Sequence, residues 1–171
     1  PAYTGGNAPD FLFKKGETPI AYAECKDLTV DLGEKSVQKQ AERYAQAFGR
    51  ILLTNYLDFQ IVYEEGDAAT IALARREGDK IVAIEENADR FLNILEDYLI
   101  PSHRTIKSAK KLAQIMASKA RIIRDNALAS LVQNQDSDIY GQYESFKQVL
   151  ISDLTPESFA DMYAQTLVYG L

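Results

Sequence analysis

The chain has little of the residue chemistry that holds most metal and redox sites. Among its 171 residues are one cysteine, Cys25, and one histidine, His103. These counts exclude an internal disulfide, a cysteine zinc cluster and a multi-histidine metal site. The formal net charge of −6 argues against indiscriminate coating of nucleic acid. No apolar run approaches the roughly twenty residues of a membrane-spanning helix, so we expect a soluble, cytoplasmic protein without a membrane partner.

A stretch near the amino terminus has the signature of a β-hairpin. Two apolar runs, Phe11–Phe13 and Ile20–Ala23, flank a polar turn. Alternate side chains of a strand share a face, so Glu24 and Lys26 project in the same direction. If the two strands pair around the turn, Asp10 lies across from the end of the second strand. We therefore expect three charged groups to meet at one edge of a sheet.

The rest of the chain separates into a mixed part and a helical part. The mixed part continues with a predicted helix, two strands and a further hairpin, at 36–48, 51–54, 59–63, and 68–76 with 80–85. Apolar residues then recur at helical spacing, which predicts helices at 91–99, 105–131, 140–151 and from Pro156 onward. We predict an α/β protein: a mixed β-sheet core flanked by helices over residues 1–87, followed by a helical region over residues 88–171.

The charged end of the hairpin carries a family resemblance. Pro9-Asp10, followed by Glu24-Cys25-Lys26, resembles the motif of the PD-(D/E)xK nuclease superfamily. Gln40 and Tyr44 follow on a predicted helix and form a QxxxY pair, which looks like the motif of the RecB-like branch. The resemblance implies a restriction-endonuclease-like sheet and a DNA endonuclease that depends on Mg²⁺, with Mn²⁺ as a possible substitute.

Two further stretches resemble one group within that superfamily. Residues 51–66 are similar to a strand pair in the nuclease domains of single-polypeptide restriction-modification enzymes, and residues 153–171 resemble the junction to their methyltransferase. This resemblance implies double-stranded DNA as partner, and an adenine methyltransferase that uses S-adenosylmethionine in a downstream domain of the same protein. We expect the chain to be a fragment of such an enzyme. Many members carry an acidic residue on a helix before the PD strand. Only nine residues precede Asp10 here, so we expect that helix to be missing from the fragment.

Phosphodiester hydrolysis explains why these residue types would be needed together. A hard cation takes oxygen ligands and makes a nucleophile of water, and Asp10, Glu24 and the main-chain carbonyl of Cys25 are the predicted ligands. Lys26 would orient or deprotonate the attacking water and offset charge on phosphorus. By resemblance, Gln40 and Tyr44 would orient the metal-site ligands or a DNA phosphate. The thiol of Cys25 points to the opposite face and is expected in the core.

A predicted helix after residue 104 is locally basic in an acidic chain. Between residues 104 and 124 there are seven Lys or Arg and no acidic residue. We predict that this helix lies along a phosphate backbone and that it contacts DNA through Arg104, Lys107, Lys111 and Arg121. The alternative for these residues is a solvated helix face, which the sequence favours equally.

Each assignment has a competing interpretation. Asp10 could be an ordinary turn residue, and Glu24 with Lys26 could be surface charges that protect an edge strand. Tyr44 could simply pack in the core, and His103 could be a helix cap or a surface residue. At the level of function, the alternatives are a non-catalytic DNA-binding or coupling module with the same fold, and an exonuclease or junction-resolving enzyme.

Overall fold

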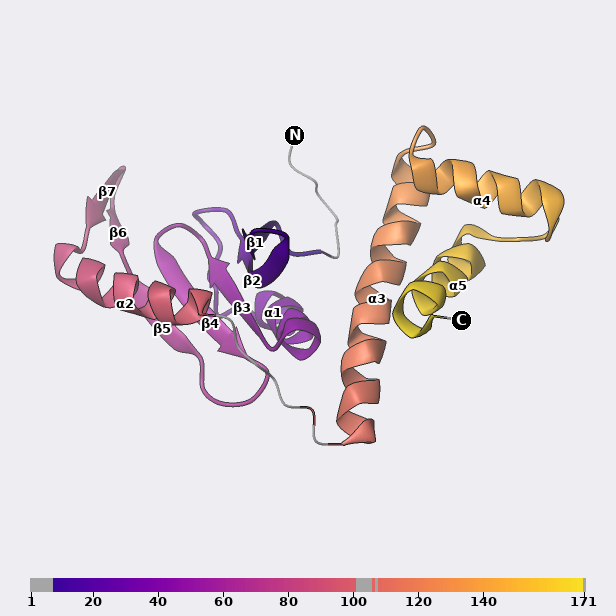
Figure 1. Cartoon of the computed structure of the whole chain (residues 1–171). Helices are drawn as coiled ribbons and strands as arrows, with labels where there is room; N and C mark the ends of the chain where they lie inside the picture. The colour runs from indigo at the N-terminus through magenta and orange to yellow at the C-terminus, as the bar shows by residue number, and fades with distance from the viewer. Residues whose placement is uncertain (1–7, 101–105, 107, 171) are drawn as a thin grey trace. The chain divides into compact units, whose positions relative to one another are not determined.

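The computed structural model describes residues 8–100, 106 and 108–170, and the chain divides between residues 107 and 108 into two compact units. The first unit holds a five-stranded sheet, and the second holds three helices (Figure 1). Our expected boundary at residues 87 and 88 differs from this division. It separated helix α2 (Ala88–Leu99) from the sheet, whereas α2 packs into the core of the sheet unit.

The five strands lie in chain order, and only one neighbouring pair is parallel. They are β1 (Phe11–Lys15), β2 (Thr18–Cys25), β3 (Arg50–Thr54), β4 (Asp58–Tyr63) and β5 (Ala69–Ala72). β2 and β3 run parallel, and the other three pairs are antiparallel. A parallel pair needs a crossover, because the chain must return to the starting edge before the next strand. Helix α1 (Lys35–Phe48) is that crossover, and it ends at Gly49, whose φ of 94° suits glycine.

The two faces of β2 have different partners. Ala21 and Ala23 pack in a core with Tyr98 of α2, while Tyr22, which points the other way, stacks on Phe48 of α1 with 4.1 Å between ring centroids. Since side chains alternate along a strand, Glu24 lies on the face that α1 covers. The crossover helix is thus placed over the charged end of β2.

Tyr98 ties α2 to the parallel strands through its hydroxyl. The hydroxyl accepts hydrogen bonds from the main-chain N–H of Tyr22 (3.2 Å) and of Leu52 (3.1 Å), and it donates to the carbonyl of Tyr22. Arg50 at the start of β3 donates to the carbonyls of Tyr98 (2.6 Å) and Ile100 (2.5 Å) at the end of α2. Buried main-chain groups at the start of the β2–β3 pairing are satisfied in this way.

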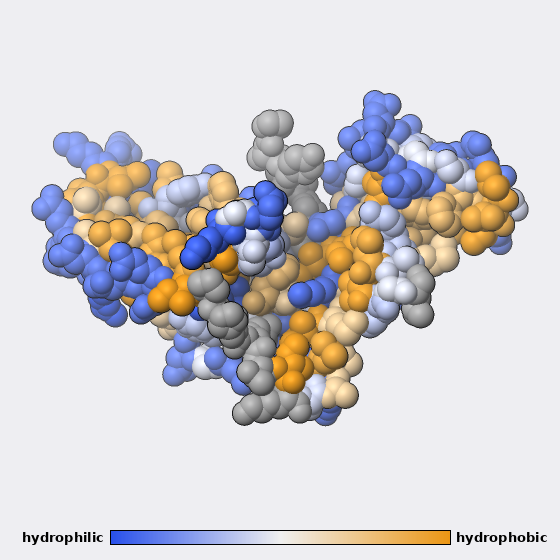
Figure 2. Space-filling view, in the orientation of Figure 1, coloured by the Kyte–Doolittle hydropathy of each residue, from blue (hydrophilic) through white to orange (hydrophobic). Residues whose placement is uncertain are grey.

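The further hairpin differs from its prediction in one respect. The stretch predicted as one strand at 68–76 divides into β5, which joins the main sheet, and β6 (Ala74–Glu77), which pairs with β7 (Lys80–Ala83) in a separate two-stranded ribbon. Leu73 lies between them, and the turn at residues 77–80 is where we expected it. The ribbon is mostly exposed, and its tip is hydrophilic (Figure 2).

The second unit consists of α3 (Ala109–Gln133), α4 (Asp138–Val149) and α5 (Pro156–Tyr169). Each begins at a residue whose side chain accepts a main-chain N–H, namely Ser108, Ser137 and Thr155. Leu131, Tyr143, Leu154 and Phe159 are among the residues of its core. The last residue of α4, Val149, and the first two residues after it, Leu150 and Ile151, are exposed, and an apolar patch is seen at the far end of α4 (Figure 2).

The predicted class is confirmed: the described residues form a mixed α/β fold with a carboxyl-terminal helical region. Within them, no helix combines the length and apolar character that crossing a membrane would require.

Tyr98→Phe tests the link between α2 and the parallel strands. The variant keeps the ring but leaves buried main-chain groups of Tyr22 and Leu52 without their partner, so we expect the free energy of unfolding to fall by about 1–3 kcal/mol. A urea titration followed by circular dichroism measures it. Tyr169→Phe, on an exposed ring, is the control and should change it by less than about 0.5 kcal/mol. Equal values for the two variants would contradict this role of the hydroxyl.

Candidate active site

Four of the predicted site residues form one hydrogen-bonded network. Lys26 donates through Nζ to Oε1 of Glu24 (2.6 Å) and to Oε1 of Gln40 (2.7 Å). Gln40 in turn donates through Nε2 to the same oxygen of Glu24 (2.9 Å) and to the hydroxyl of Tyr44 (3.3 Å). Glu24 and Lys26 come from the end of β2, and Gln40 and Tyr44 come from successive turns of α1. The network therefore depends on the crossover.

Asp10, the residue immediately before β1, lies beside this network. The register of β1 pairs Phe11 with Ala23, so Asp10 is level with Glu24. Oδ2 of Asp10 accepts the main-chain N–H of Cys25 at 2.8 Å. The N–H and the carbonyl of one residue in a strand point to the same edge, so the carbonyl of Cys25 also lies on the side of Asp10.

One oxygen of Glu24 is buried without a partner. The residue is 4% exposed, and its Oε2 has no hydrogen bond within the described part of the chain, although Oε1 accepts two. An unsatisfied buried carboxylate oxygen is costly. Such an atom at the end of a strand, beside a second carboxylate, is the kind of donor that a cation would satisfy.

The oxygens at this position suit a hard cation. Glu24, Asp10 and the carbonyl of Cys25 are all oxygen donors, and Mg²⁺ usually takes only one or two carboxylates and completes its shell with water and substrate phosphate. Across the residues that the structure describes, no group of three or more His, Cys, Asp or Glu side chains could hold a metal ion. An ion held by these two carboxylates and one carbonyl would take its remaining ligands from water and substrate phosphate.

The surroundings of Glu24 change its titration. Burial raises the pKa of Glu24, the hydrogen bond and positive charge of Lys26 oppose the shift, and the negative charge of Asp10 adds to it. The net direction is upward because burial is the largest cause. A carboxyl with a raised pKa loses folding free energy as it ionises, and a bound cation would reverse that.

Tyr44 both packs in the core and contacts a site residue, the two roles that the sequence left open. It is 0% exposed and packs in the core, yet its hydroxyl accepts from Gln40. Burial raises the pKa of Tyr44, and the Arg43 guanidinium lies 5.3 Å from the ring centroid. The buried ring fixes the position of the hydroxyl, and the hydroxyl in turn holds the side-chain amide of Gln40.

The predicted DNA-binding residues belong to other parts of the chain. Arg104 and Lys107, like His103, lie outside the described residues. Lys111 and Arg121 are on α3 in the helical unit, where Arg121 is exposed and Lys111 partly so. Ser118, three residues before Arg121 on the same helix, is 6% exposed and therefore buried.

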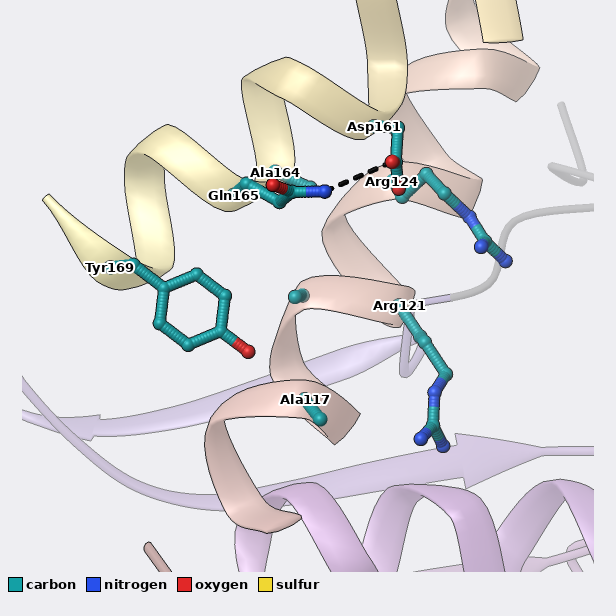
Figure 3. Close-up of a pocket in the computed structure, with 8 residues that line it drawn as sticks. Ala117, Arg121, Arg124, Asp161, Ala164, Gln165 and Tyr169 are labelled. Atoms are coloured by element: carbon teal, nitrogen blue, oxygen red, sulfur yellow. Dashed lines mark hydrogen bonds between the residues drawn. The ribbon is translucent and has the colours of Figure 1, made fainter. Parts of the chain in front are cut away.

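A cavity of about 350 Å³ lies between α3 and α5. Figure 3 shows Arg121 and Arg124 extending from α3 in a similar direction, and the hydrogen bond of 2.9 Å from Gln165 to Asp161 on α5. Arg124 is engaged by Asp125 at 2.7 Å. Three of the eight residues that line the cavity are alanines, and the charged ones are Arg121, Arg124 and Asp161.

Tyr56 is a residue near the site that sequence reasoning missed. Its hydroxyl hydrogen-bonds with the thiol of Cys25, and Asp10 is close enough to influence both. Cys25 is therefore a half-buried residue beside Tyr56, rather than the core thiol that we expected. The Asn-Tyr-Leu-Asp sequence at 55–58 is typical of a turn between two strands, but turn composition alone does not show which strand end the turn faces.

No protein-family model, curated protein or solved structure matches this chain. The nuclease resemblance therefore stays a prediction that rests on the residues themselves.

Glu24→Gln tests whether the carboxylate is strained by burial. With the folded pKa raised, the contribution of Glu24 to stability is present below its unfolded pKa and is lost as pH rises through the folded pKa. Glutamine does not ionise, so the melting temperature of the variant minus that of the wild type should increase between about pH 4 and pH 7. Thermal unfolding at several pH values without divalent ions measures it. A difference that falls as pH rises would contradict the assignment.

Proposed function

We propose that the chain is the Mg²⁺-dependent DNA endonuclease domain of a cytoplasmic restriction-modification enzyme and that it hydrolyses phosphodiester bonds. The observation that carries the proposal is the buried carboxylate of Glu24, with one oxygen held by Lys26 and Gln40 and the other without a partner among the described residues. A structural ion pair needs no second carboxylate beside it, and Asp10 is placed there.

The cation would be held at the end of β2 by Asp10, Glu24 and the main-chain carbonyl of Cys25. The chemistry that Mg²⁺, or Mn²⁺ in its place, supplies when bound is positive charge beside the phosphate and activation of water at neutral pH. Without positive charge, the two carboxylates would repel the backbone of DNA.

Lys26 is the residue proposed to act on the reacting phosphate. Its ammonium has three N–H donors, and two of them are directed to Glu24 and Gln40. The third can donate to a phosphate oxygen or to the attacking water, so Lys26 offsets the charge that develops in the transition state. Gln40 and Tyr44 are positioning residues, because they hold Glu24 and Lys26 in this geometry.

The remaining parts of the proposal concern the larger protein. Double-stranded DNA is the substrate, and the helices of the second unit lead to a downstream methyltransferase domain, which alone would use S-adenosylmethionine. This part of the proposal rests on the resemblance of residues 51–66 and 153–171 to single-polypeptide restriction-modification enzymes.

Lys26→Ala tests the chemical role. Cleavage of plasmid DNA by the full-length protein in Mg²⁺ should fall by about 10²–10³-fold, the loss typical for one donor to developing charge, while DNA affinity changes little. Lys39→Ala, on the exposed side of α1 next to Gln40, is the matched control and should cleave normally. Cleavage that persists in Lys26→Ala, or that needs no divalent ion, rules out the proposal.

The second candidate is a DNA-binding module without catalysis, which the exposed Lys119 and Arg121 of α3 favour. It predicts DNA binding without cleavage at any Mg²⁺ or Mn²⁺ concentration. In Lys119→Ala and Arg121→Ala, affinity should fall for all DNA sequences, and the slope of log affinity against log salt should fall by about one each. Unchanged salt dependence would remove α3 from the DNA interface.

Cleavage of covalently closed circular DNA separates an endonuclease from an exonuclease, because an exonuclease needs a free DNA end.

A further inference from the structure

Tyr56 has a backbone conformation that its side chain disfavours. Its φ is 70°, and no other residue with a side chain has a positive φ within the part of the chain that the structure describes. This left-handed region is easy for glycine and tolerable for asparagine, but it is costly for a bulky residue because Cβ approaches the following carbonyl. Strain of this kind gathers at functional sites, so the position raises the question of what the tyrosine does.

The turn is held by the neighbours of Tyr56. Thr54 Oγ1 accepts the main-chain N–H of Tyr56 (2.9 Å) and donates to the carbonyl of Asp58 (2.8 Å). Asn55 Oδ1 accepts from the N–H of Leu57 (3.1 Å) and of Asp58 (2.8 Å). Thr54 and Asn55 are buried, whereas Tyr56 is 58% exposed. More than half of the Tyr56 side chain is therefore exposed, although its backbone conformation is strained.

The turn faces the same sheet end as the candidate active site. β3 is parallel to β2 with Thr54 opposite Cys25, and the N–H of Lys26 donates to the carbonyl of Thr54 at 2.7 Å. Tyr56 follows two residues later, and its hydroxyl reaches the thiol of Cys25. Its partly exposed ring thus stands at the rim beside Cys25, on the sheet face opposite the side chains of Glu24 and Lys26.

We propose that Tyr56 is the residue that positions the DNA strand, by packing its ring against the nucleotide next to the cleaved phosphate. This inference rests on the proposed endonuclease function. At a rim that carries the carboxylate of Asp10, a neutral aromatic face adds contact without repelling phosphate. Packing against a base or sugar tolerates many sequences, because every nucleotide offers such a face.

Tyr56→Gly separates this role from a structural one. Glycine relieves the strain, so the melting temperature should rise by about 2–4 °C, while affinity for a fluorescent duplex should fall by about tenfold through loss of the aromatic contact. Affinity is measured by anisotropy in a Lys26→Ala background, which leaves the DNA intact. Tyr56→Phe keeps the ring and should bind DNA as tightly as Tyr56.

Tyr63→Ala is the matched control, because Tyr63 is also exposed but pairs with Arg50 at the opposite end of β3; it should leave DNA affinity unchanged. Wild-type affinity in Tyr56→Gly, or a lower melting temperature, overturns the inference. If Lys26→Ala abolishes cleavage while Tyr56→Gly binds normally, only the inference on Tyr56 fails. If Lys26→Ala still cleaves, the proposed function fails, whatever Tyr56 does.

Discussion

The parallel pairing of β2 with β3 is the constraint on which the rest of the sheet unit depends. Parallel neighbours cannot be joined by a tight turn, so α1 must cross the sheet, and its path brings Gln40 and Tyr44 over Glu24 and Lys26. The same pairing brings the turn after β3 to the end of β2. At the other end of this pairing, the hydroxyl of Tyr98 accepts hydrogen bonds from the main-chain N–H groups of Tyr22 and Leu52.

Two features that cost stability gather at one end of this sheet. One is the buried carboxylate of Glu24 with an unsatisfied oxygen, and the other is the left-handed backbone of Tyr56. Burial of an ionised carboxylate is costly, and Tyr56 is 58% exposed, so its ring does not offset its backbone strain by full burial. Folds retain such costs where a site requires them. Their coincidence at one end of the sheet is an argument for function that does not depend on the family resemblance.

Much of the local structure could be predicted from the sequence. The hairpin of β1 and β2, helix α1, and strands β3 and β4 follow from apolar alternation, helical spacing and the stop at Gly49. The split of β5 from β6 could not be predicted, because residues 68–76 read as one strand and only pairing with β4 or β7 distinguishes the parts. The docking of α2 was missed because a helical pattern does not show which surface its apolar stripe will meet.

For the site itself, the sequence alone determined the residue types and their spacing: Glu24 and Lys26 share a face by alternation, and Gln40 and Tyr44 are one helical turn apart. Tertiary structure decided that these two pairs meet, that Asp10 is level with Glu24, and that Tyr56 stands at the same rim. The physical reason is that alternation and helical repeat are local properties of the backbone. Strand register and the path of a crossover depend on which distant surfaces bury each other.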